Sequence, residues 1–240
     1  MPDIIQVHNA SRAFGPKAGI FDCSLSVAPS EVHALIGLNG AGKTTLMRAM
    51  LGMLHLTSGS VHIGGVPLNN TAQKAWKDVG HLIERPFAYP ELDVRTNLKL
   101  AAQLNMVEPV CVPKTVDAAM IEFGLSTYAE VAARKLSLGN KQRLGLAAAL
   151  QHHPKLIILD EPTSGLDPAG VIMLREVLLH RLDDGVGVLV SSHHLDEVAR
   201  IANRISVINY GRYIGSLEPD APDLERAFFD LVLADDEQRF

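Results

Sequence analysis

The sequence is poor in cysteine and aromatic residues, and it has no long hydrophobic run. Two of its 240 residues are cysteines, and aromatic side chains make up 5%. Cys23 and Cys111 lack the paired spacing of a zinc site, so we interpret both as buried or half-buried small side chains in a reducing compartment. The longest apolar runs, 156–159 and 186–190, have the length of strands, whereas a membrane-spanning helix needs about 20 apolar residues. Any role at a membrane therefore requires a partner protein.

Signals for secretion and for nucleic-acid binding are also missing. Residues 1–10 have no basic start followed by an apolar stretch, so we expect no signal peptide and a protein that stays in the cytosol. The formal net charge is −5. Because affinity for nucleic acid usually depends on Lys and Arg that neutralise phosphates, no nucleic-acid partner is expected.

The apolar runs that are present predict an α/β fold. Short runs rich in Val, Ile and Leu alternate with stretches of helical period, which is typical of a mostly parallel sheet covered by helices. We expect helices after three of the four buried strands, which are 32–36, 156–159, 186–190 and 205–208. Hydrophobic residues make up 47% of the chain, enough for one compact domain over 1–240 with at most a small second lobe.

Two regions depart from this alternation. Near the N-terminus, short segments alternate or lie beside turn glycines, which predicts an antiparallel β subdomain from 4–7, 24–27 and 60–63. Between 86 and 151 the strand runs stop and helical periods replace them, at 92–104, 116–123 and 142–150. We therefore predict an inserted helical subdomain over 86–151, with 1–85 and 152–240 forming the core.

The most specific motif is a glycine-rich phosphate loop. Gly37-Leu38-Asn39-Gly40-Ala41-Gly42-Lys43-Thr44 fits the pattern GxxxxGK[ST], and it lies between an apolar strand and a helical stretch that starts at Thr45. Glycines allow the backbone N–H groups and the helix N-terminus to face an anion. Lys43 adds a positive charge for the β and γ phosphates, and the Thr44 hydroxyl can bind Mg²⁺. An incidental glycine-rich turn would not have these flanking elements.

Two carboxylates end the strand expected at 156–159. We assign Asp160 to the metal side of the site, and Glu161 to the attacking water, which it orients or from which it takes a proton. Taken alone, a strand that ends in Asp-Glu is more often a helix cap or a solvated turn. The phosphate loop elsewhere in the chain makes the catalytic interpretation the better one.

Three more motifs follow in a fixed order, and with them the chain resembles ATP-binding-cassette (ABC) nucleotide-binding domains over essentially its whole length. Residues 136–143, LSLGNKQR, resemble the family signature, normally LSGGQ. Leu138 replaces a glycine and Asn140 replaces the glutamine. Ser137 and Gly139, which in the family meet the γ-phosphate of the opposite subunit, are present. By itself a serine at this place would be an ordinary helix N-cap.

Two single residues gain a role from the same resemblance. Asp167 in the segment 164–167 resembles the D-loop residue that links the two ATP sites of a dimer, although it could equally be only a helix cap. His193, after the strand expected at 186–190, resembles the switch histidine that reaches the γ-phosphate. A lone histidine after a strand is more often structural, and only its position in the motif order reverses that interpretation.

Two further positions resemble family motifs less closely. Phe14 lies where the family has an aromatic residue, commonly tyrosine, that stacks on adenine, and the alternative is a core phenylalanine. Glu84 stands where the Q-loop usually has glutamine; a carboxylate there can still bind Mg²⁺, and the alternative is an exposed loop acid. Glu84 together with the signature variant is most similar to the bacitracin and lantibiotic resistance branch.

The resemblance implies an ATPase that uses ATP and Mg²⁺, pairs with a second copy of itself and drives a separate membrane permease. It further implies a bacterial protein peripheral on the cytoplasmic face of the cell membrane, with export of a peptide antibiotic or another drug. Two alternatives remain open: a non-transport ABC ATPase that acts on DNA or the ribosome, and a regulatory module that holds ATP without hydrolysis. Glu161 and His193 argue against the second.

Overall fold

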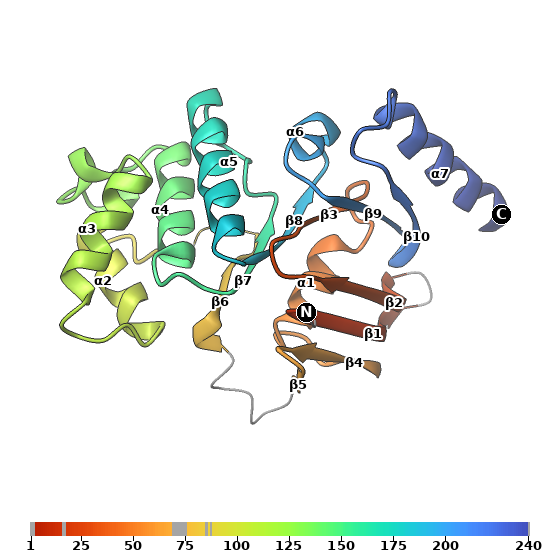
Figure 1. Ribbon diagram of the computed structural model, residues 1–240, viewed down its shortest axis with the longest axis horizontal. Coiled ribbons are helices and arrows are strands. Elements are labelled where there is room, and N and C mark those ends of the chain that lie inside the picture. The colour runs from red at the N-terminus through yellow and green to blue at the C-terminus, as the bar shows by residue number, and fades with distance from the viewer. Residues whose placement is uncertain (1–2, 16–17, 69–75, 85, 87, 240) are drawn as a thin grey trace.

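The computed structural model describes residues 3–15, 18–68, 76–84, 86 and 88–239. The chain forms two β-sheets, one of which lies along an edge of the molecule (Figure 1). The first sheet is antiparallel, has four strands in the order β2-β1-β4-β5, and consists of β1 (Ile5–Gly15), β2 (Ala18–Val27), β4 (Ser58–Ile63) and β5 (Val66–Pro67). The predicted antiparallel β segment is therefore confirmed, but as a sheet of its own with longer strands than the sequence pattern suggested.

The second sheet has six strands in the order β10-β9-β3-β8-β7-β6. All neighbours are parallel except β10 and β9. Its strands are β3 (Val32–Ile36), β6 (Val79–Leu82), β7 (Leu156–Asp160), β8 (Gly187–Ser192), β9 (Arg204–Asn209) and β10 (Arg212–Leu217). The four predicted buried strands are all present, whereas β6 and β10 were not predicted. The mostly parallel α/β fold is confirmed.

Helices follow three of the four predicted strands, as expected. In the described part of the chain, α1 (Lys43–Met50) follows β3, α5 (Pro168–Asp183) follows β7 and α6 (Leu195–Ala199) follows β8. Three more lie together at one end of the molecule, and they are α2 (Val94–Leu104), α3 (Val112–Glu122) and α4 (Leu138–Leu150) (Figure 1). The last helix, α7 (Leu224–Arg239), lies at the opposite end beside β10 (Figure 1).

The parallel sheet buries both of its faces, which explains its continuous apolar strands. In β7, Ile157 and Leu159 belong to the core shared with α2 to α5 and α7, while Leu156 and Ile158 belong to the core shared with α1 and the antiparallel sheet. The period of two thus divides each strand between two cores. The carboxyl ends of β3, β7 and β8 meet at one edge, where the predicted motifs begin.

One expectation needs correction. Cys23 is buried, but Cys111 is exposed at the start of α3, because its position precedes the helix instead of facing a core. In addition, the described residues include no helix with the length and apolar character needed to cross a bilayer.

Candidate nucleotide site

The phosphate loop connects β3 to α1 and is held by its own lysine. Gly42, with φ of 108°, is the left-handed residue that precedes α1, and Ala41 N donates to Leu38 O at 3.0 Å. Lys43 is 6% exposed, and its Nζ donates to Gly37 O at 2.6 Å and to Leu38 O at 3.3 Å. A buried ammonium needs such partners. Helix N–H groups and a positive charge therefore face the same place, which suits a phosphate.

Thr44 and Asp160 meet although they are 116 residues apart. Thr44 Oγ1 donates to Asp160 Oδ2 at 2.7 Å, and Ser191 Oγ donates to Asp160 Oδ1 at 2.5 Å. Asp160 is buried, so two hydroxyl donors compensate its carboxylate for the loss of water. The structure thus brings together two of the three residues predicted to bind a metal, and it adds Ser191, to which the sequence assigned no role.

Glu161 occupies a strained backbone position between two predicted partners. Its φ of 47° is unusual for a residue with a side chain, and its N–H donates to Ser191 Oγ at 2.9 Å. Its carboxylate lies between His193 and Lys43, with Oε2 2.7 Å from His193 Nδ1 and Oε1 3.6 Å from Lys43 Nζ. Glu161 therefore contacts both of the other residues predicted as catalytic, His193 and Lys43.

The Q-loop glutamate is separate from this cluster. Glu84, with φ of 64°, pairs with Arg48 at 2.5 Å on the surface. Both residues line a groove of about 490 Å³ whose other walls come from β6, α2 and α4. The structure therefore places Thr44 with Asp160 but Glu84 with Arg48.

Phe14 is also on the surface. It lies in β1 with 58% of its surface exposed, and the Arg12 guanidinium lies 5.6 Å from its ring centre. The alternative that Phe14 is a core residue is wrong. The ring is accessible for stacking.

The signature segment opens α4. Ser137 is the N-cap of α4 and accepts from Asn140 N at 3.2 Å, while Leu138 is 70% exposed. Added to Gly139, a Cβ would lie 2.9 Å from Gly165 O, so the signature contacts the predicted D-loop of its own chain. In Figure 1 the label of α4 lies on the far side of β6 and β7 from α1, and among the described residues no hydrogen bond or ion pair joins 137–140 to 37–44 of the same chain.

Asp167 caps α5. It accepts from Gly170 N at 2.9 Å and from Arg143 at 2.8 Å, and these bonds, led by Arg143, lower the pKa of its carboxyl. The prediction that Asp167 caps a helix is thus confirmed. Its role as a link between two ATP sites stays a prediction.

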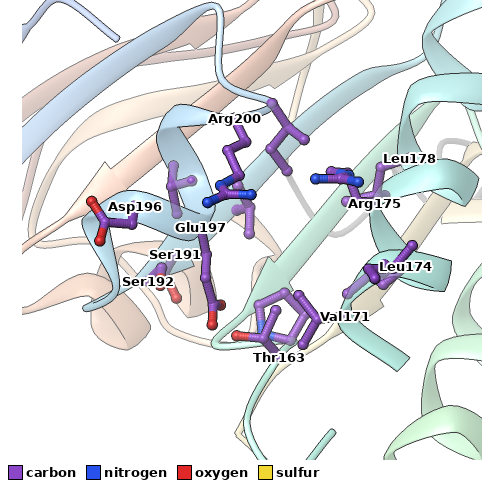
Figure 2. Close-up of a pocket in the computed structure, with 15 residues that line it drawn as sticks. Thr163, Val171, Leu174, Arg175, Leu178, Ser191, Ser192, Asp196, Glu197 and Arg200 are labelled. Carbon is purple, nitrogen blue, oxygen red and sulfur yellow. The ribbon is translucent and has the colours of Figure 1, made fainter. Parts of the chain in front are cut away.

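A cavity of about 180 Å³ lies between α5 and α6, next to the site (Figure 2). It shares Ser191 with the site, but most of its wall is apolar and includes Leu174 and Val198. Neither the phosphate-loop glycines nor Lys43 line it. The cavity is therefore separate from the phosphate loop, although Arg175 and Arg200 are part of its wall (Figure 2).

The donor chemistry of the site fits magnesium. Thr44 and Asp160 offer a hydroxyl and a carboxylate, and Mg²⁺ prefers oxygen ligands and is commonly bound by one or two protein groups together with substrate phosphates. Among the described residues, no cluster of three or more His, Cys, Asp or Glu able to hold a metal is found. The sequence did not predict a role for Ser191 in this site. A serine at the end of a buried strand was the one feature of the sequence that could have indicated such a role.

Taken together, a phosphate loop after β3, a carboxylate pair at the end of β7 and a helix that begins at the signature define a P-loop ATPase of the ABC type. A family model described as ABC transporter matches residues 20–164, and the chain belongs to this family. It is accordingly an ATP-binding protein and an ATPase that powers transport.

Relatives of known kind share most of its length. The chain is 34% identical over 231 residues to the lantibiotic transport ATP-binding protein SrtF of Streptococcus pyogenes, covering 96% of this chain and 98% of the relative. It is 32% identical to the bacitracin transport ATP-binding protein BcrA of Bacillus licheniformis, covering 92% and 71%. The predicted similarity to this branch is confirmed.

Solved structures agree with the fold. One described as the ATP binding subunit of an ABC transporter superposes with a TM-score of 0.86 at 26% identity, covering 96% of this chain and 98% of that one. The structure of cbiO1 from Clostridium perfringens, described as part of the ABC transporter complex cbiONQ, gives a TM-score of 0.79 at 26% identity, covering 100% and 96%.

Proposed function

We propose that Lys43, Glu161 and His193 carry out ATP hydrolysis in a site shared by two copies of this chain. The observation that carries the proposal is the contact of Glu161 with both His193 and Lys43 beside the phosphate loop. In the proposed reaction, Lys43 binds the β and γ phosphates, Glu161 takes a proton from the attacking water, and His193 orients Glu161 and the γ-phosphate. Phe14 stacks on adenine.

Magnesium completes the proposed site. Thr44 and Asp160 would bind it, and the ion would neutralise charge on the transferring phosphoryl group. Ser191 keeps Asp160 in place through its hydroxyl. Glu84 is the third residue predicted to bind the metal, but its carboxylate pairs with Arg48 instead.

The second part of the site comes from the partner copy. Ser137, Leu138, Gly139 and Asn140 open α4, away from α1 of the same chain. The serine hydroxyl and the free N–H groups at a helix N-terminus form an anion site. We propose that they close on the γ-phosphate held by the other copy, with Asp167 at the dimer interface, so that ATP joins two copies head to tail.

A membrane permease is the proposed third component. The groove beside Glu84 lies between the ATP-binding core, which we assign to 1–85 and 152–240, and the helical subdomain assigned to 86–151. A segment of a permease seated there would contact both parts, so their relative movement during hydrolysis would reach the membrane. The protein is then peripheral on the cytoplasmic face of the membrane.

We infer export as the direction and a peptide antibiotic or another drug as the cargo. This rests on the names of the relatives, which include lantibiotic, bacitracin and probable multidrug transport proteins. The same relatives favour a transporter over an ATPase that acts on DNA or the ribosome.

The substitution Glu161→Gln tests the proposed chemistry. It removes the proton acceptor but keeps the size of the side chain, and we expect hydrolysis to fall about 100-fold or more while ATP still binds. Size-exclusion chromatography with ATP and Mg²⁺ should then show a stable dimer. Lys43→Ala is the matched control that, on its own, should neither bind ATP nor dimerise with a second Lys43→Ala copy. A monomeric Glu161→Gln protein that binds ATP would overturn the shared site.

A further inference from the structure

The turn between β9 and β10 lies directly against the phosphate loop. Gly211 N donates to Ala41 O at 2.7 Å, and Gly211 O accepts from Phe21 N at 2.7 Å. A Cβ on Gly42 would come within 3.0 Å of Gly211 Cα, and one on Gly211 would come within 2.0 Å of Gly19 O. Both positions also have a positive φ that disfavours a side chain. The β1–β2 hairpin, this turn and the phosphate loop therefore touch backbone to backbone.

The bond to Gly211 fixes the orientation of one phosphate-loop amide. In a trans peptide the C=O and N–H groups point in opposite directions. Because Ala41 O points at the β9–β10 turn, the N–H of Gly42 points away from it. Gly42 precedes the first turn of α1, so this N–H has no acceptor within the helix. It is available to a phosphate, and the turn determines its direction.

The C-terminal end of α7 contacts the same β9–β10 turn and the residue before it. Asn209, the residue before the turn, is 4% exposed, and its Nδ2 donates to Asp235 Oδ2 at 2.9 Å and to Asp236 Oδ1 at 3.0 Å. An amide NH₂ group has two hydrogens, so each carboxylate can receive one. Arg239 donates to Asp235 Oδ2 at 2.8 Å, and its guanidinium lies 5.5 Å from the ring centre of Tyr210 in the turn.

These contacts make a continuous connection from α7 to the phosphate loop. Phe228 and Val232 of α7 are buried in the same core as β9, which fixes the helix against the sheet (Figure 1). On the other side of the turn, Cys23 Sγ donates to Gly211 O at 3.1 Å. Burial raises the pKa of the Cys23 thiol, so this donor keeps its proton.

We propose that Asn209, Asp235 and Asp236 are positioning residues for ATP. They hold the β9–β10 turn, and the turn keeps the Gly42 N–H aimed at the phosphates. Their side-chain hydrogen bonds join Asn209 to α7, and the bond from Gly211 N to Ala41 O joins the turn to the phosphate loop. This inference rests on the phosphate-binding role proposed for the loop.

The double substitution Asp235→Ala/Asp236→Ala tests the proposal. It removes both acceptors of Asn209, so the turn loosens and one amide hydrogen bond to a charged phosphate weakens. We expect the KM for ATP and the Kd for ADP to rise roughly 3- to 10-fold, with kcat at saturating ATP within about twofold. Glu237→Ala is the control, because Glu237 is exposed on the same helix, and it should match the parent protein.

A conservative variant separates positioning from general stability. Asp235→Asn/Asp236→Asn keeps an oxygen acceptor at each position, and it should restore the KM to within about twofold of the parent value. A merely structural role for α7 would lower Tm without raising KM. An unchanged KM in the double alanine variant, at any Tm, therefore overturns the proposal, as does an equal rise for Glu237→Ala.

Hydrogen exchange keeps the test valid if the double variant does not fold. In the single variant Asp236→Ala, the amide of Gly211 should exchange several-fold faster because its bond to Ala41 O opens more often. Unchanged exchange would contradict the proposal. ATP binding that survives Lys43→Ala would instead refute the phosphate-loop role itself, so the two failures are distinguishable.

Discussion

At the level of single residues, the hydroxyl of Ser191 bonds to both carboxylate residues that follow one another at the end of β7. It donates to Asp160 and accepts from the N–H of Glu161, so it links the proposed metal ligand to the proposed base. The strained φ of Glu161 costs on the order of 1–3 kcal/mol, and this backbone bond helps to hold it. Ser191 thus orients the side chain of Asp160 and the backbone of Glu161.

We predict that Ser191→Ala lowers kcat by about 10-fold or more, because an interaction with a charged group is worth about 1.5–3 kcal/mol and 1.4 kcal/mol is a factor of ten. ATP affinity should change much less, since Lys43 and the loop remain. Steady-state ATPase assays measure both. Ser192→Ala is the control, because the hydroxyl of Ser192 accepts a hydrogen bond from the backbone N–H of His194 and not from Glu161. A kcat equal to that of the Ser192 control would contradict the prediction.

At the scale of elements, His33 joins strands of both sheets. Its Nδ1 donates to Ser26 O of β2 at 2.8 Å, and its Nε2 accepts from Ser206 Oγ of β9 at 2.8 Å. A carbonyl can only accept, so the proton is on Nδ1. Burial, followed by the charge of Arg204, lowers the pKa of His33 to about 4 from 6.5.

This shift predicts that the fold loses stability in mild acid. Above pH 6.5 the imidazole is neutral in both the folded and unfolded chain, whereas between pH 6.5 and 4 only the unfolded chain takes up the proton. Stability therefore falls as pH falls through this window, by about 2 kcal/mol between pH 7 and pH 5 from His33 alone.

Urea unfolding of the parent and of His33→Asn at pH 7 and pH 5 measures this effect. Asparagine can still donate to Ser26 O, and it does not titrate. The loss between the two pH values should be about 2 kcal/mol smaller in the variant. Partial burial also lowers the pKa of the half-buried His152 to about 4, so part of the loss should remain. Equal losses in parent and variant would contradict the prediction.

Some strands and helices could be predicted from the sequence pattern, and others could not. The apolar strands and α1 were predictable because burial on both faces leaves continuous runs of Val, Ile and Leu. Strands β6 and β10 were not, because β6 includes Gly80 and His81 and β10 is half exposed, so neither has a clear period. Their sheet positions come from pairing with β7 and β9.

At the scale of the whole molecule, the proposed shared site predicts complementation between two defective chains. Lys43→Ala keeps an intact signature, and Ser137→Ala keeps an intact phosphate loop. A mixed dimer would contain one site in which both parts are intact. ATPase activity of the mixture should therefore exceed the mean of the separate proteins, and an activity equal to that mean would contradict the model.

Asp93→Ala is the matched control for the Ser137 substitution. Asp93 caps α2 by accepting from Thr96 N, much as Ser137 caps α4. Loss of either cap should cost about 1 kcal/mol of stability. Only the Ser137 variant should lose ATPase activity, because only that cap is proposed to meet a phosphate.

The sequence alone determined which chemistry the protein carries. A glycine spacing, a strand that ends in two carboxylates and a signature serine are local patterns, and their order along the chain identified the family before any contact was known. Local patterns also set the strands of the parallel sheet, because periodicity depends only on near neighbours.

Only the tertiary structure decided how these parts meet. Thr44 lies 116 residues from Asp160, and Cys23 lies 188 residues from Gly211, yet each pair is hydrogen bonded. Such contacts depend on the order of strands in the sheets. They also depend on glycines at the places where three backbone segments touch, because a side chain would not fit there. No short stretch of sequence contains that information, because it arises only when distant segments are packed against one another.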